Sequence, residues 1–427
     1  MPNEATLFTH AAPGATPRYS QTDLAWERDA SGVGPLVLVP MALTAGLAAY
    51  GVWEARSHER RLSRLPIRVH VNGTRGKSSL TRLIAAGLRA GGIPTFAKTT
   101  GTMARMIGLE GREVDVYRVG QPNIIEQTRI VRRAVEAGAR ALVVECMAVS
   151  PELQPFSELR LVRSTVGVIT NCRADHLDLM GPTVDDVAWT LAQSCPAGGD
   201  LFTTEHERAW ILEKVARRRG TRLHEVDAGM VTRDHLDGFT YVEHAENLAL
   251  ALAVCEHQGV TRPVALAGMH HARPDPGALR RYVVHSGSKR VEFVNAFAAN
   301  DPDSTLLIWE RLGLGVARPG VQRIVLANCR RDRLQRSEQL AELVGRRLTA
   351  DHVVLSGQGT DLVAFQAARH GVDPSRLSNL GGLGAEAVYE HVLDRVGSQG
   401  VIVGVGNIVG LGEEIVHHFS DRAVSHG

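Results

Sequence analysis

The chain has 427 residues, enough for two domains with their own cores, and a net charge of only +2 from 48 basic and 46 acidic residues. Neither this charge nor the 5% of aromatic residues favours binding to nucleic acid. Five cysteines without a Cys-x-x-Cys pair indicate a reducing compartment and argue against disulfides and structural zinc.

The N-terminal part contains a candidate membrane span. Residues 33–53 carry no charged side chain, and 21 apolar residues can cross a bilayer core. The arginine-rich segment 54–64 predicts that the C-terminal side faces the cytoplasm. We therefore expect an extracytoplasmic arm at 1–32 and one transmembrane helix at 33–53 in the plasma membrane, with cytoplasmic domains after it. An apolar helix packed on the soluble part is the alternative.

After this segment, apolar strand patterns alternate with helical patterns. The expected strands are 66–71, 141–146, 166–170, 321–327, 352–355 and 401–405, with helices such as 78–90 and 124–137 between them. This alternation predicts an α/β fold with parallel sheets. Proline and glycine at 272–277 predict a boundary between a central domain at 54–272 and a smaller α/β domain at 273–427.

The segment 71–80, VNGTRGKSSL, follows the first strand and opens a helix, as a phosphate-binding loop does. Its lysine supplies a charge for the β- and γ-phosphates of a nucleoside triphosphate, and its first serine can bind Mg²⁺. Only four of the basic residues are lysines, yet one stands here. The expected nucleotide-binding residues are Gly73, Thr74, Arg75, Gly76, Lys77, Ser78 and Ser79. A glycine turn with a solvated lysine is the alternative.

Two later segments offer metal ligands. Thr100 lies in a hydroxyl-rich turn, Lys98-Thr99-Thr100-Gly101-Thr102, and could give Mg²⁺ a second hydroxyl. Glu145 ends a buried strand, where a carboxylate is costly unless it meets a cation or hydrogen-bond donors. An ordinary Ser/Thr turn and a salt-bridged structural glutamate are the alternatives.

The third expected strand ends in a polar cluster. Asn171 is followed by Asp175, His176 and Asp178. Neutral imidazole at His176 could bind a second Mg²⁺ or Mn²⁺, although a lone histidine is usually structural. Further on, residues 244–251 open an alanine-rich helix in which Asn247 is either a nucleotide-base contact or a polar residue at a core helix start.

Together these segments resemble the Mur ligase superfamily of ATP-dependent amide ligases. The segments follow one another in the same order as in that superfamily: the loop, the threonine turn, the strand-end glutamate, the Asn-to-Asp cluster and the asparagine helix. The closer resemblance is to the ligase subunits of bacterial poly-γ-glutamate (capsule) synthases, and it is carried by RVHVNGTRGKSSLTRLIAAGLR, FAKTTGT, LVVECMAVSPELQ, ITNCRADHLDLMGPT and GVGNIVGLGEEIV. The resemblance implies a Mur-ligase-like central domain and a Rossmann-like C-terminal domain.

The resemblance also implies an activity and its components. Glutamate would be joined to a poly-γ-glutamate chain through a γ-glutamyl phosphate, with ATP and Mg²⁺ or Mn²⁺ as cofactors. Lys77, Glu145 and His176 would be catalytic, and Arg333 would clamp carboxylates. Small membrane subunits that export the polymer, and an oligomeric assembly, are the implied partners.

The chain departs from the family pattern at two places. No lysine lies between His176 and Lys214, where many Mur-type ligases carry a carbamylated lysine, and the segment 295–304 replaces the usual Asp-x-x-His-Asn-Pro. A different Mur-type ligase such as a folylpolyglutamate synthase, a P-loop kinase and a non-catalytic nucleotide-gated membrane scaffold remain as alternatives. Folate ligases would lack the span, and cell-wall ligases carry an additional N-terminal domain for which the segment before residue 66 leaves no room.

Overall fold

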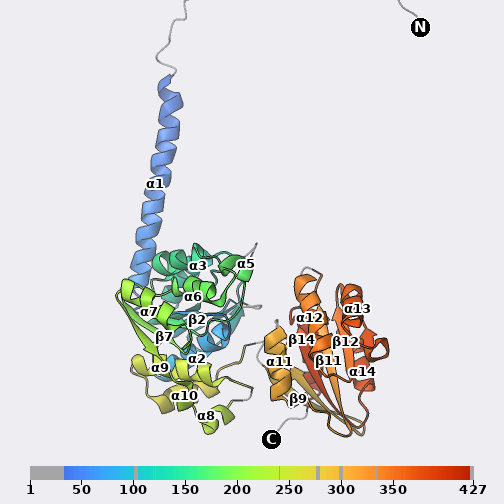
Figure 1. Ribbon diagram of the computed structural model, residues 1–427. Coiled ribbons are helices and arrows are strands. Elements are labelled where there is room, and N and C mark those ends of the chain that lie inside the picture. Colours follow the sequence, from blue (N-terminus) through green and yellow to red (C-terminus); the bar gives the residue numbers. More distant parts are fainter. Residues whose placement is uncertain are drawn as a thin grey trace, which may run out of the picture. The chain divides into compact units, whose positions relative to one another are not determined.

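The computed structural model describes residues 33–100, 104–118, 120, 122–239, 241–275, 279–297, 302–331 and 334–423. The chain divides into two units, residues 1–57 and 58–427. Helices and strands alternate along most of the second unit, and Figure 1 gives their labels.

A single long helix, α1 (Val33–Ser63), is the described part of the first unit and continues into the second. By length and composition, its stretch Leu38–Ser63 could cross a membrane. Apolar side chains are exposed along it at Leu38, Val39, Met41, Leu43, Leu47, Tyr50, Val52 and Trp53. The helix runs past the predicted end at residue 53, because Ala, Glu, Arg and Leu in the next segment are all good helix formers.

The first sheet has eight strands in the order β4-β3-β2-β5-β1-β6-β7-β8. The six strands from β2 to β8 in this order are parallel, whereas β3 and β4 add an antiparallel edge. The bounds are β1 Ile67–Asn72, β2 Thr95–Lys98, β3 Arg105–Ile107, β4 Glu113–Asp115, β5 Ala141–Glu145, β6 Val166–Ile169, β7 Gly199–Thr203 and β8 Thr221–Glu225.

Helices cover both faces of this sheet. Alternate residues of each strand point to opposite faces, so Val143 packs with the cluster around α2 while Leu142 and Val144 pack with the cluster around α3. The helices are α2 Lys77–Ala90, α3 Glu126–Glu136, α4 Leu153–Phe156, a π-helix Ser157–Val162, α5 Leu177–Met180, α6 Val184–Ala192, α7 Ala209–Arg218, a 3₁₀ turn Ala228–Met230, α8 Arg233–Asp237, α9 Ala245–His257 and α10 Arg262–His270.

The second sheet has six strands in the order β13-β12-β11-β14-β10-β9, and only β9 is antiparallel to its neighbour. Its strands are β9 Arg280–Ser286, β10 Lys289–Asn295, β11 Val321–Cys329, β12 His352–Gly357, β13 Leu377–Asn379 and β14 Gln399–Gly406. Its helices are α11 Pro302–Arg311, α12 Leu334–Arg346, α13 Thr360–Arg369, a 3₁₀ turn Pro374–Arg376, α14 Ala385–Asp394 and α15 Leu411–Asp421.

These helices also pack on both faces, since α12 and α13 share one core with the sheet and α14 and α15 share another. The expected α/β fold with mostly parallel sheets is therefore confirmed. The domain boundary at 272/273 stays a prediction.

A buried ion pair fastens β1 to the π-helix. His70 Nδ1 lies 2.8 Å from Glu158 Oε2, and both side chains are fully buried. The other Glu158 oxygen accepts from the backbone and hydroxyl of Ser164. Burial alone would lower the pKa of His70, but Cys146 and Glu158 together outweigh burial and raise this pKa to about 10. The imidazole is therefore charged at neutral pH, two residues before the end of β1.

The His70–Glu158 pair should make the free energy of unfolding depend on pH. Because the pKa of His70 is higher in the folded chain than in the unfolded chain, its contribution is full below about pH 6.5 and is lost as the pH rises toward about 10. Substituting His70→Gln should lower the free energy of unfolding by about 3–5 kcal/mol at neutral pH, because Glu158 would stay buried without its cation. Thermal unfolding from pH 6 to pH 10 measures both effects.

The matched control is His206→Gln, because His206 is exposed and lies 3.4 Å from the exposed Glu225. This substitution should change stability by less than about 0.5 kcal/mol. Equal effects of the two substitutions, or a His70→Gln variant as sensitive to alkaline pH as the parent, would contradict the role of the buried pair.

Candidate active site

The predicted phosphate loop joins β1 to α2. Gly76 has φ +85° and stands directly before the first residue of α2, so the loop turns sharply into the helix N-terminus. A Cβ atom on Gly73 would lie 2.0 Å from Thr170 Oγ1, and one on Gly76 would lie 2.5 Å from Asn247 Oδ1. Both glycines are therefore required by close approach as well as by backbone conformation.

The loop holds its own lysine in place. Lys77 Nζ donates to the carbonyl oxygen of Gly73 at 2.6 Å and to that of Thr74 at 3.3 Å. The ammonium group therefore stays over the loop, where the N–H groups of the first turn of α2 also create positive potential. Ser79 lies in this first turn. This arrangement suits a polyphosphate.

Asn171, just after β6, fastens the loop from the neighbouring strand. Its Oδ1 accepts from Thr74 Oγ1 at 2.6 Å and from the Arg75 backbone N–H at 3.2 Å, and its Nδ2 donates to the Arg75 carbonyl. Thr170 Oγ1 donates to the same carbonyl at 2.7 Å. Sequence reasoning named Asn171 only as a strand end. The signal that could have found its role is the Thr-Asn pair leaving a strand parallel to β1.

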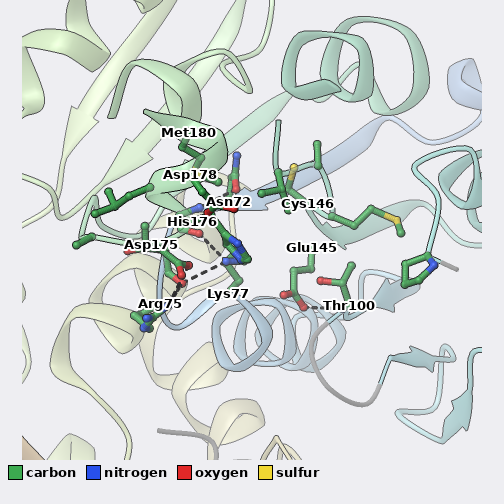
Figure 2. Close-up of a pocket in the computed structure, with 18 of the residues that line it drawn as sticks. Asn72, Arg75, Lys77, Thr100, Glu145, Cys146, Asp175, His176, Asp178 and Met180 are labelled. Carbon is green, nitrogen blue, oxygen red and sulfur yellow. Dashed lines mark hydrogen bonds and ion pairs between the residues drawn. The ribbon is translucent and has the colours of Figure 1, made fainter. Parts of the chain in front are cut away.

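The predicted metal ligands Ser78, Thr100 and Glu145 do meet. Glu145 Oε2 accepts from Ser78 Oγ at 2.8 Å and from the backbone N–H of Thr100 at 2.7 Å, and the glutamate is buried. Figure 2 shows the Thr100 side chain beside Glu145. A carboxylate and a hydroxyl are the hard oxygen donors that Mg²⁺ prefers, so this donor set fits the ion. Their roles as metal ligands stay predictions.

A pocket opens beside the loop. Its lining includes Lys77, Thr100, Glu145 and the segment 174–178 after β6. Figure 2 shows Glu145 and Thr100 on one side and Asp175 and His176 on the other. Asp175 forms an ion pair with Arg75 at 3.0 Å, so this aspartate also braces the loop.

His176 lies in the pocket lining with φ +45°, in the left-handed region that non-glycine residues rarely adopt. Such a conformation costs roughly 1–3 kcal/mol, and residues that keep it often serve a site. Within the described residues, however, no group of three or more His, Cys, Asp and Glu side chains could hold a metal ion. The second metal site at His176 therefore stays a prediction.

One further predicted residue, Asn247, lies outside this pocket lining. Asn247 is buried in the first turn of α9, where its Nδ2 donates to Glu243 Oε1 at 2.9 Å and its Oδ1 faces Gly76. It contacts the loop, and its contact with a nucleotide base stays a prediction. Arg333 lies outside the described residues.

Two family models match parts of this chain. Residues 71–193 match the Mur ligase middle domain, and residues 281–422 match the poly-gamma-glutamate synthase CapB C-terminal domain. The chain is 37% identical to the capsule biosynthesis protein CapB of Bacillus anthracis, over 92% of this chain and 85% of that protein. It is also 37% identical to the PGA synthase CapB of Bacillus subtilis, over 89% of this chain and 97% of that protein.

Solved structures with the same fold include folylpolyglutamate synthases. The bifunctional folylpolyglutamate synthase/dihydrofolate synthase of Yersinia pestis, complexed with AMPPNP and Mn ion, has a TM-score of 0.63 at 17% identity, covering 86% of this chain and 92% of that chain. The Mycobacterium tuberculosis folylpolyglutamate synthase, complexed with ADP and AMPPCP, has a TM-score of 0.61 at 16% identity, covering 86% and 98%. The expected Mur-ligase-like fold is thereby confirmed.

The crowding at Gly76 predicts a specific loss of nucleotide affinity. Substituting Gly76→Ala should weaken binding of Mg·AMPPNP at least about tenfold, because the new methyl group would force Asn247 and the loop apart. Isothermal titration of the purified protein measures the dissociation constant.

Gly92→Ala is the matched control, since Gly92 has φ +77° but no atom within 4 Å of the added Cβ. Both variants carry similar backbone strain, about 1 kcal/mol, and only Gly76→Ala adds the clash with Asn247, so Gly76→Ala should lose more stability. Unchanged nucleotide affinity in Gly76→Ala, or equal losses in both variants, would contradict this account of the loop.

Proposed function

This chain belongs to the CapB family of Mur-type ligases, and we propose that it is an ATP-dependent ligase that polymerises glutamate into poly-γ-glutamate. Its CapB relatives include a PGA synthase and a capsule biosynthesis protein. The observation that carries the proposal is the hydrogen bonding of Ser78 and Thr100 to Glu145 beside the phosphate loop. This constellation suits the transfer of a phosphoryl group from ATP.

The proposed reaction has two steps. A γ-carboxylate oxygen attacks the γ-phosphorus of ATP, so that an O–P bond forms, the bond to ADP breaks, and an acyl phosphate results. The amine of another glutamate then attacks the acyl carbon, releases inorganic phosphate, loses a proton and leaves an amide. Carboxylate attack on an anionic triphosphate needs positioning and charge neutralisation more than covalent help from the protein.

The residues of the site supply those two needs. Lys77 and the N–H groups of residues 73–76 would hold the β- and γ-phosphates. Ser78 and Glu145, with Thr100, would hold Mg²⁺, which neutralises negative charge on the phosphates when it is bound. Asn171 and Asp175 would keep the loop in shape through the bonds already described. We assign His176 to a second Mg²⁺ or Mn²⁺, and Arg333 to the substrate carboxylates.

Three alternatives differ from this ligase in their products or in their acceptor. A P-loop kinase would release a stable phosphorylated product instead of an amide, and a nucleotide-gated scaffold would turn over little ATP. A folylpolyglutamate-like ligase would need a folate acceptor. The likeness to folylpolyglutamate synthase structures is below 20% identity and therefore concerns the fold alone.

The ligase proposal predicts phosphate release that depends on glutamate. Protein in membranes, supplied with ATP and Mg²⁺, should release phosphate and form γ-linked oligomers only when glutamate is added. Lys77→Ala and Glu145→Ala should each reduce this release at least about a hundredfold, because the phosphates and the metal would lose a ligand. A phosphate assay and mass spectrometry of the products measure both.

The matched controls are Lys214→Ala and Glu152→Ala, two exposed residues of the same types outside the pocket. They should retain activity. Phosphate release that ignores glutamate would refute the substrate, and full activity without Lys77 or Glu145 would refute the site. If the protein is active only with co-expressed membrane subunits, those subunits belong to the enzyme.

We further propose that α1 anchors the protein in the plasma membrane by a single pass, with the ligase in the cytoplasm. The exposed apolar side chains of α1 support a membrane span. The arginines that follow them support the cytoplasmic orientation of the ligase. An anchored ligase could meet small membrane subunits that export the polymer, and assemble as an oligomer with them. Release of the protein from membranes by alkaline carbonate would contradict the anchor.

A further inference from the structure

An arginine with no role in the steps above lines the same pocket as Lys77 and Glu145. Arg118 follows β4, and 22% of its side chain is exposed. Its partner is Glu126, the first residue of α3. An arginine at the edge of a pocket that handles carboxylates could itself bind one.

Glu126 holds Arg118 along one edge of its guanidinium group. Arg118 Nε donates to Glu126 Oε2 at 2.7 Å, and Nη2 donates to Oε1 at 3.1 Å. Among the described residues no hydrogen-bond partner meets Nη1. The group is therefore fixed in orientation by a two-point contact while a second edge stays available, which matches the two oxygens of a carboxylate.

A fully buried lysine changes the charge of this cluster. Lys98, at the end of β2, lies with its Nζ 2.7 Å from Glu126 Oε1, and none of its side chain is exposed. Burial lowers the pKa of Lys98 more than Glu126 and Glu145 raise it. Arg118 and Lys98 therefore share the Glu126 carboxylate, and Glu145 lies within electrostatic reach of Lys98. The guanidinium of Arg118 keeps an open edge at the pocket wall, and such an edge favours an anionic ligand.

We propose that Arg118 binds a carboxylate of the oligo-γ-glutamate chain whose γ-carboxylate is phosphorylated, and that Lys98 is a positioning residue for it. Lys98 holds Glu126 and prevents this glutamate from neutralising Arg118 completely. The inference rests on the proposed ligase function. Every γ-linked unit keeps a free carboxylate, so a chain presents such a group next to its reacting end, and Arg118 would hold it beside Glu145.

Binding measurements on the full-length protein in detergent test the proposal without turnover. Tri-γ-glutamate and free glutamate are titrated separately in the presence of Mg·AMPPNP. Arg118→Gln should raise the dissociation constant for tri-γ-glutamate at least about tenfold, since a charge-assisted contact is lost. The dissociation constant for Mg·AMPPNP should change less than about twofold, which also shows that the variant is folded.

Two further variants separate charge from geometry. Arg118→Lys keeps the positive charge but loses the planar group that donates two parallel hydrogen bonds to a carboxylate. This variant should therefore bind tri-γ-glutamate with intermediate affinity. Lys98→Met removes the ammonium group from Glu126 with little change in shape, so Glu126 pairs with Arg118 alone and binding should weaken severalfold. The matched control is Arg112→Gln, an arginine whose side chain is 87% exposed and lies 3.7 Å from Glu110, and it should bind like the parent.

Each alternative outcome has a distinct meaning. Unchanged affinity of Arg118→Gln for tri-γ-glutamate would overturn the subsite, and an equal loss of Mg·AMPPNP affinity would show that Arg118 serves the nucleotide instead. If only free glutamate binding weakens, the site belongs to the incoming amino acid and the proposal is wrong. A parent protein that binds Mg·AMPPNP but neither glutamyl ligand would refute the proposed function itself.

Discussion

The parallel pairing of β1 with β5 and β6 is the constraint on which the site depends. Val71 pairs with Glu145 across one side, and Asn72 pairs with Ile169 across the other. The carboxyl ends of all three strands therefore meet at one edge of the sheet, and the phosphate loop begins there. If β5 ran in the opposite direction, Glu145 would lie at the opposite edge of the sheet and the loop would be left without its carboxylate.

Charge explains why the residues around this edge are so closely tied to one another. A buried Glu145 needs donors, and Ser78 and Thr100 supply them. We propose that the same oxygen is a ligand of the divalent ion that binds with the triphosphate. Lys77 is held over the loop by two carbonyl oxygens. The site thus has both signs of charge in place before any ligand binds, which reduces the reorganisation that phosphoryl transfer requires.

The sequence was sufficient for the strands that form the centre of each sheet and for the meeting of Ser78 with Glu145. Continuous apolar runs mark buried parallel strands, and strand ends locate polar side chains. The short strands β3 and β4 at one end of the first sheet were missed, because three residues are too few to show a period. The pairs His70–Glu158 and Lys98–Glu126 were missed for another reason. Tertiary folding brings the two residues of each pair together, and in the first pair they lie 88 positions apart in the sequence. No local sequence pattern predicts such a contact.

The most direct test of the central claim follows an oxygen atom. Glutamate labelled with ¹⁸O in its γ-carboxylate is polymerised with unlabelled ATP, and the released inorganic phosphate is analysed by mass spectrometry. If a carboxylate oxygen attacks the γ-phosphorus and the amine then displaces phosphate, one ¹⁸O atom leaves in phosphate for every amide bond formed. Polymer formation with unlabelled phosphate would contradict an acyl phosphate at this site.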